Sequence, residues 1–221
     1  MSSTPHRSPD SIKAYTKLGL RVYDRLVMYL LLKHVWGCNP RDLVKHYREH
    51  VTSNHADIGV GTGYCLDRCR FDSPDPRLVL IDLQSNCLEF TARRLARYRP
   101  RTYVRDVLRP IRDIADAPFD SIALGGVIHC LAGDLNQKSR VFDTLSMLAK
   151  SGTKIFGYSL VSDDVPRRAR SRAVHRLLNW LRVVDNANDR LSDLKHELST
   201  RFIDCRVRPI GCMALFSAVV P

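Results

Sequence analysis

The sequence predicts an α/β fold in which helices cover a mostly parallel β-sheet. Short runs of apolar residues, as expected for strands buried on both faces, alternate with stretches whose apolar residues recur at helical spacing. A glycine-rich turn follows the first of these runs, where a strand would turn sharply into the next element. The chain then closes with two β segments joined by a tight turn, which breaks the alternation.

The first part of the chain is expected to lie outside the sheet. Residues 1–10 are polar and are predicted to be disordered. Residues 11–50 are predicted to form a helical cap. This cap would contain one or two helices up to about His34, a break at Gly37 and Pro40, and one more short helix.

Residues 51–160 carry the alternation that predicts the core of the domain. Strands are expected at 56–59, 78–81, 102–105, 119–124 and 153–158. Helices are expected at 64–69 directly after the glycine-rich turn, at 85–98 with Ser85 as N-cap, and after a cap at Asp134. Gly152 is expected to end the last helical unit.

The remaining residues are predicted to complete a single domain that spans residues 11–221. Residues 161–200 are expected to form helices over the substrate, with Pro166 at the start of a long basic helix. Residues 201–221 are expected to form two closing strands, at 201–207 and 212–219.

The glycine-rich turn has a spacing that indicates what it binds. It reads Asp57-Ile-Gly59-Val-Gly61-Thr-Gly63, and Asp82 ends the next apolar run. The third glycine follows the second by two residues instead of three, so the pattern is not a dinucleotide fingerprint. A phosphate-binding P-loop is excluded because no Lys-Ser/Thr pair follows. Asp82 could accept hydrogen bonds from both hydroxyls of a ribose, so the pattern predicts a nucleoside site.

This motif resembles motif I of the class I S-adenosylmethionine (SAM)-dependent methyltransferases. The resemblance extends over about 56–219 and implies a Rossmann-like, seven-stranded, mostly parallel sheet with a C-terminal antiparallel strand pair. It implies that Asp57 and the glycines hold the methionine part of SAM, that Asp82 holds the ribose, and that Asp106 binds the adenine amine. The implied cofactor-binding residues are Tyr23, Asp57, Gly59, Gly61, Gly63, Asp82, Leu83, Asp106, Val107, Gly125 and Gly126.

The segment from Phe119 to Leu131 resembles motif IV of small-molecule methyltransferases, which ends strand four. Ligands of open α/β sheets bind at this end of the strands, so Gly125 and Gly126 would line the SAM pocket. His129 is the candidate catalytic residue, because its pKa is near neutrality and it could accept a substrate proton. The alternative is that His129 only shapes the pocket.

The acceptor is expected to be a small molecule. The sequence lacks the Asn/Asp-Pro-Pro-Tyr/Phe motif of enzymes that methylate amino groups of bases or glutamine, and it lacks a Pro-Cys pair at strand four. The resemblance implies a substrate site built from two flanking segments. Their aromatic and amide residues are Tyr15, Tyr23, Tyr29 and Trp36 in the first, and Asn179, Trp180, Asn186 and Asn188 in the second.

Two alternative functions remain at this stage. The net charge of +12 would suit RNA, although no aromatic residues alternate with the arginines. The second alternative function is that of a non-catalytic SAM-binding protein. Seven scattered cysteines without a C-x-x-C pair predict no metal site. No apolar run is long enough for a membrane span and no secretory signal is visible, so the protein is expected in the cytoplasm.

Overall fold

The computed structural model describes residues 24–221. The polar stretch 1–10, the first part of the expected helical cap and Tyr23 lie outside the described residues. Among those described, no helix is both long and apolar enough to cross a membrane.

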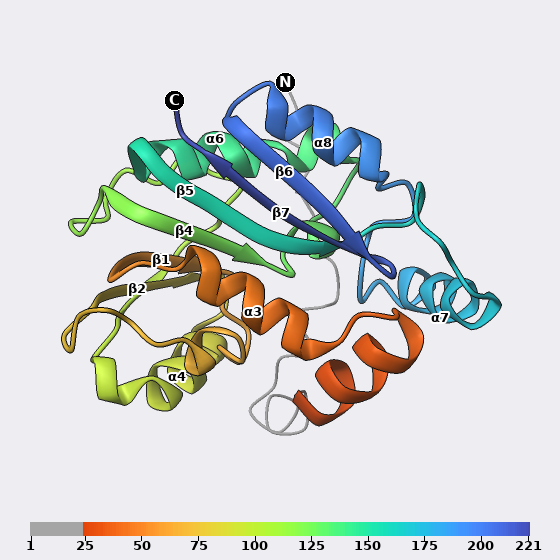
Figure 1. Cartoon of the computed structure of the whole chain (residues 1–221), viewed down its shortest axis with the longest axis horizontal. Coiled ribbons are helices and arrows are strands. Elements are labelled where there is room, and N and C mark those ends of the chain that lie inside the picture. Colours follow the sequence, from red (N-terminus) through yellow and green to blue (C-terminus); the bar gives the residue numbers. More distant parts are fainter. Residues whose placement is uncertain (1–23) are drawn as a thin grey trace, which may run out of the picture.

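Seven strands form one sheet in the order β3-β2-β1-β4-β5-β7-β6 (Figure 1). Their bounds are β1 (Asn54–Ile58), β2 (Arg77–Asp82), β3 (Arg101–Val104), β4 (Phe119–Gly125), β5 (Ala149–Leu160), β6 (Ile203–Ile210) and β7 (Met213–Val219). The first five strands pair in parallel, whereas β7 pairs antiparallel with both β5 and β6. The predicted fold class is therefore confirmed, including the antiparallel pair at the end.

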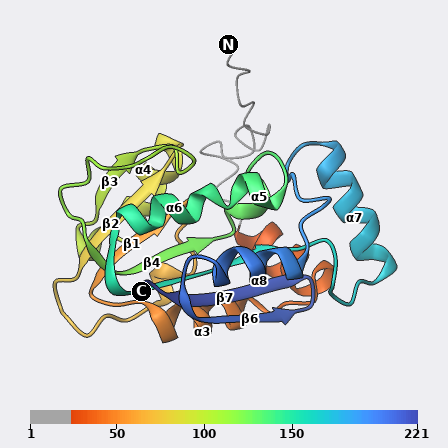
Figure 2. The ribbon, with the colours of Figure 1, turned by 90° about the horizontal axis from the view of Figure 1, so that it is seen from above.

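Helices cover both faces of the sheet. They are η1 (Asp24–Val35, a helix of π type), α3 (Pro40–His50), α4 (Ser85–Arg94), α5 (Leu135–Lys138), α6 (Arg140–Met147), α7 (Ala169–Trp180) and α8 (Leu191–Ser199), with 3₁₀ turns η2 (Leu66–Arg68), η3 (Ala96–Tyr98) and η4 (Ile128–Cys130). Figure 2 shows α5, α6 and α8 across one face, and Figure 1 shows α3 and α4 on the other.

Each face has its own hydrophobic core, and the strands contribute to both in alternation. On β2, Val79 and Ile81 pack with the α6–α8 side, whereas Leu80 packs with the η1–α3–α4 side. This alternation follows from the two-residue period of strand side chains, and it explains why β2 has the continuous apolar run from Leu78 to Ile81. The two cores hold the carboxyl ends of β1 and β4 next to each other.

Some expected boundaries were wrong. The helix expected at 64–69 is only the 3₁₀ turn η2. The chain beyond it contains Pro74 and Pro76, which disfavour helical backbone before each proline. The N-cap of α4 is Gln84, not Ser85, because Gln84 has extended backbone.

Other boundaries differ at the C-terminal half of the chain. Pro166 lies before α7 and not at its start, since the N-cap is Arg168. Strand β5 begins at Ala149 and includes Gly152. Gly152 has a φ of 83° and lies near the register shift between β5 and β4. The cap at Asp134 is confirmed, as its carboxylate accepts a bond from the Gln137 backbone N–H at 2.9 Å.

Candidate functional site

A cavity lies at the carboxyl ends of β1 and β4, and the glycine loop forms one wall. Gly59, Gly61 and Gly63 have φ values of 67°, 50° and 67°, which L side chains rarely adopt. A Cβ at Gly59 would lie 2.1 Å from Val127 Cγ2, and one at Gly63 would lie 2.6 Å from Thr91 Cγ2. At Gly61 a Cβ would meet no atom of the described residues within 4 Å. The outer glycines therefore permit packing, while the middle one faces open space.

The loop is fastened to the N-terminal helix by a network that sequence reasoning missed. Asp24 of η1 accepts a bond from the Thr62 hydroxyl at 2.6 Å and pairs with Arg94 of α4 at 2.8 Å. Arg94 also donates to the Thr62 carbonyl at 2.7 Å. No local spacing could reveal this contact, because its members are up to 70 positions apart.

Asp57 lies buried at the end of β1 and lines the cavity. Burial and the charge of Asp82 raise its pKa to about 8, although a hydrogen bond from Tyr47 of α3 acts in the opposite direction. At neutral pH the free protein therefore holds Asp57 mostly protonated. A cation bound beside it would favour the ionised form.

Four predicted cofactor residues do not line the cavity: Asp82, Leu83, Asp106 and Val107. The Asp82 side chain lies next to the glycine loop in space. Its carboxylate accepts a bond from the Gln84 backbone N–H at 2.9 Å, and burial raises its pKa while N–H groups of Gly61 and Val60 lower it. Asp106 accepts from the Leu108 N–H at 3.0 Å and lies 3.6 Å from Arg109. The two acids lie at the ends of β2 and β3 and do not belong to the cavity lining.

The end of β4 lines the cavity with Gly125, Gly126 and His129, as expected from motif IV. A Cβ at Gly125 would lie 2.3 Å from the Tyr47 hydroxyl oxygen and 3.0 Å from Tyr158. Only glycine therefore fits between these two tyrosines. The Gly126 N–H donates to the Tyr158 carbonyl at 2.8 Å, which holds β4 against β5 at the cavity.

The hydrogen bonds of His129 assign a proton to one ring nitrogen. Nδ1 accepts a bond from the Leu160 backbone N–H at 3.2 Å, and Ser159 Oγ lies 3.4 Å away. Because a backbone N–H can only donate, Nδ1 has no proton and the neutral ring carries it on Nε2. Burial, and then the charges of Lys138 and His175, lower the pKa of His129 to about 3. This arrangement favours a hydrogen-bond donor over a base at His129.

The rest of the cavity is mainly apolar. Its walls come from η1, from the end of α7 and from the loop that follows; they include Met28, Leu31, Leu32, Trp36, Leu160, Leu178, Val183, Val184 and Met213. Asn179 and Asn186 do not line it. Asn186 is buried and accepts from His175 Nε2 at 2.8 Å, while its amide donates to the Leu160 carbonyl at 2.8 Å. Trp180 is 78% exposed. The amides of Asn179 and Asn186 therefore bond within this loop and do not line the cavity.

The sheet order and the glycine-walled cavity at the carboxyl ends of the strands are those of a Rossmann-like domain. A family model described as a methyltransferase domain matches residues 56–155. The demethylluteothin O-methyltransferase of Streptomyces thioluteus is 32% identical over 209 residues, covering 95% of this chain and 90% of the relative. The chain belongs to the class I SAM-dependent methyltransferases.

Other relatives and solved structures agree with this assignment. Methyltransferase aurB of Calcarisporium arbuscula is 30% identical, covering 94% of this chain and 95% of the relative. The physcion biosynthesis cluster O-methyltransferase of Aspergillus chevalieri is 28% identical, with 95% of each chain covered. The DhpI–SAH complex has a TM-score of 0.69 at 12% identity and covers 98% of both chains. At that identity the likeness concerns the fold alone.

Proposed function

We propose that the protein transfers the methyl group of SAM to a small-molecule acceptor. The observation that carries this proposal is a single cavity that joins the glycine loop to an apolar chamber. Its lining includes Gly61 and Asp57 together with apolar side chains such as Trp36 and Val184. A mostly apolar cavity with few polar groups suits a small molecule better than a nucleic-acid strand. The names of the relatives, which include two O-methyltransferases of small molecules, point the same way.

The residues at the loop fit SAM. The free space above Gly61 would admit the methionine part, and the buried carboxyl of Asp57 would bind its amino group. Asp82 and Asp106, at the ends of adjacent strands, would hold the ribose and the adenine. Bound SAM would supply a methyl group on a sulfonium that leaves as a neutral thioether. The protein's own contribution would be to align the acceptor with that methyl group.

The geometry of His129 suggests the kind of acceptor. Its Nε2–H would donate to an acceptor oxygen and stabilise negative charge there. Cys130 also lines the cavity, but burial raises the pKa of its thiol to about 12, so it is a poor base at neutral pH. We therefore propose an acceptor whose own hydroxyl is acidic, such as an enol or a phenol. Such an oxygen could lose its proton to water and bind as the anion.

An RNA substrate would draw on the basic surface, but much of the arginine is paired with carboxylates. The ion pairs include those of Arg94, Arg97, Arg99, Arg101 and Arg201, each at 3.0 Å or less. A guanidinium group that is paired with a carboxylate is less available to bind a phosphate, so fewer arginines could contact RNA than the arginine content suggests.

Labelled SAM offered together with total RNA and a small-metabolite extract would test the proposal. Label is expected in the small-molecule fraction. Gly61→Val serves as the matched inactive protein, because its side chain would fill the space above the loop. Label chiefly in RNA would refute the small-molecule assignment. A folded protein whose melting temperature does not rise with millimolar S-adenosylhomocysteine would refute SAM binding itself.

A further inference from the structure

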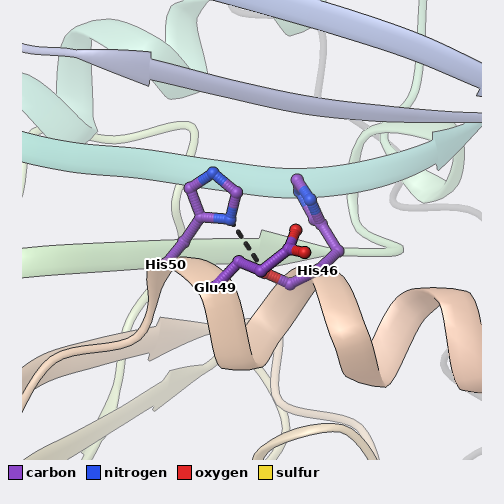
Figure 3. A group of neighbouring side chains, drawn as sticks. All are labelled: His46, Glu49 and His50. Carbon is purple, nitrogen blue, oxygen red and sulfur yellow. Dashed lines mark hydrogen bonds between the residues drawn. The ribbon is translucent and has the colours of Figure 1, made fainter.

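Helix α3 carries a second group of side chains that the cavity does not use. Tyr47 faces the cavity, whereas His46, Glu49 and His50 gather elsewhere on the same helix (Figure 3). Their spacing of three and four residues places them on neighbouring turns of one face. One nitrogen of each histidine and one carboxylate oxygen of Glu49 all lie within 4.8 Å of one another. We refer to these three residues as the α3 cluster.

The hydrogen bonds of the two histidines leave one lone pair on each ring. His46 Nε2 bonds to the Phe216 carbonyl at 2.9 Å, and His50 Nδ1 bonds to the His46 carbonyl at 2.8 Å. Since a carbonyl can only accept, both nitrogens must be protonated. His46 Nδ1 and His50 Nε2 then carry the lone pairs. Metal-bound histidines typically donate their other N–H to a carbonyl in this way.

Both rings are held in place by Phe156 of β5. His50 stacks on it at 5.4 Å with an interplanar angle of 26°, and His46 meets it edge-on at 5.9 Å. His46 is also buried. Rings that are already ordered reduce the cost of binding a metal ion.

Glu49 is the third possible ligand of the α3 cluster, and its carboxylate is accessible to a metal ion. Its carboxylate faces solvent and pairs only loosely with Lys45, at 3.8 Å with both side chains exposed. Pairs of this kind contribute little, so a metal ion could displace the lysine. Arg208 opposes metal binding, because its charge interacts with His46 and would repel a cation.

We propose that the α3 cluster is a reversible binding site for a divalent transition-metal ion of the Zn²⁺ class. Two imidazoles and one carboxylate suit Zn²⁺, whereas Mg²⁺ and Ca²⁺ prefer oxygen ligands alone. Three protein ligands would leave a position for water. Occupancy would stabilise the last turn of the helix that brings Tyr47 to Asp57.

Titration of the metal-free, full-length protein with Co²⁺ tests the proposal, because its visible absorption reports the ligands. One equivalent is expected to bind without the charge-transfer bands of thiolate ligands, and Zn²⁺ should displace it. His50→Ala and Glu49→Gln should each lower the affinity by at least about tenfold. His196→Ala is the matched control, since it removes an exposed histidine from α8 and should leave binding unchanged.

These measurements distinguish metal binding at the α3 cluster from metal binding by other side chains. Circular dichroism would first establish that each variant is folded, which is expected because Glu49 is exposed and His50 is only half-buried. Equal affinity in wild type and His50→Ala would overturn the proposal. Thiolate bands would assign the metal to cysteines instead, and a lack of saturable binding would exclude the site.

Discussion

Replacing Lys138 by methionine is expected to destabilise the protein strongly. The Lys138 and Asp189 side chains are 0% and 1% exposed, and the ammonium lies 2.8 Å from both carboxylate oxygens. Methionine keeps most of the volume but leaves the carboxylate buried without its cation. Loss of one partner of such a pair costs about 3–5 kcal/mol. For a chain of this size, that corresponds to a melting temperature lower by roughly 6–20 °C.

Thermal unfolding of three variants would check this magnitude. Lys150→Met is the matched control, because Lys150 pairs with Asp120 at 2.6 Å while both side chains are about half exposed. This exposed pair should contribute no more than about 1 kcal/mol. The double variant Lys138→Met/Asp189→Leu should recover most of the loss, because no charge is left unpaired.

The pH dependence provides a second readout. Burial raises the pKa of Asp189 to about 6 even with Lys138 present, and the pKa should rise further without it. A raised pKa in the folded state means that stability is greatest at low pH and is lost as pH rises. The deficit of Lys138→Met should therefore be smaller at pH 5 than at pH 8. A loss no larger than that of Lys150→Met would refute the reasoning.

Three further predictions concern the candidate site. Gly61→Val should abolish S-adenosylhomocysteine binding measured by calorimetry. Gly152→Val should retain binding, because Gly152 also has a positive φ and open surroundings but lies away from the cavity. Equal binding by the two variants would place the ligand elsewhere. Binding at pH 7 should release a proton, because Asp57 is protonated in the free protein and a bound amino group favours its carboxylate. Binding heats measured in two buffers of different ionisation enthalpy would show this proton release. The affinity for S-adenosylhomocysteine should increase with pH up to about pH 8. Asp57→Asn should lose both the proton release and the pH dependence. His129→Ala should reduce turnover, and His129→Gln should restore part of it if donation through Nε2 matters; a base would not be rescued in this way, so failure of glutamine to restore turnover would contradict the donor role.

Local sequence patterns predicted the parts of the fold that depend on near neighbours. The glycine loop could be recognised because Gly59, Gly61 and Gly63 all need left-handed backbone. Asp134 could be recognised as a cap because its partner, Gln137, is three residues away. The helix expected at 64–69 was wrong because an apolar pattern this short does not distinguish an α-helix from a 3₁₀ turn.

Contacts between distant residues could not be predicted in the same way. Lys138 looks like an ordinary exposed lysine until Asp189 is placed beside it, 51 positions away. The proton assignment of His129 depends on the Leu160 N–H, which reaches it only after β5 has paired with β4. The sequence therefore pointed to His129, which lines the cavity, but the position of the proton on its ring could not be predicted without its partner.

The position of β7 has a consequence for how the protein is made. This strand lies between β5 and β6, so residues near 213–219 connect β6 to the rest of the sheet. Phe216 of β7 is fully buried in the core with Ile155 and Phe142. During synthesis, β1 to β5 can assemble first, but one side of β5 stays unpaired until Val219 has left the ribosome. Exposed strand edges of this kind promote aggregation. Ribosome stalling or truncation before Met213 should therefore yield a chain that depends on chaperones, even though its whole glycine loop is already present.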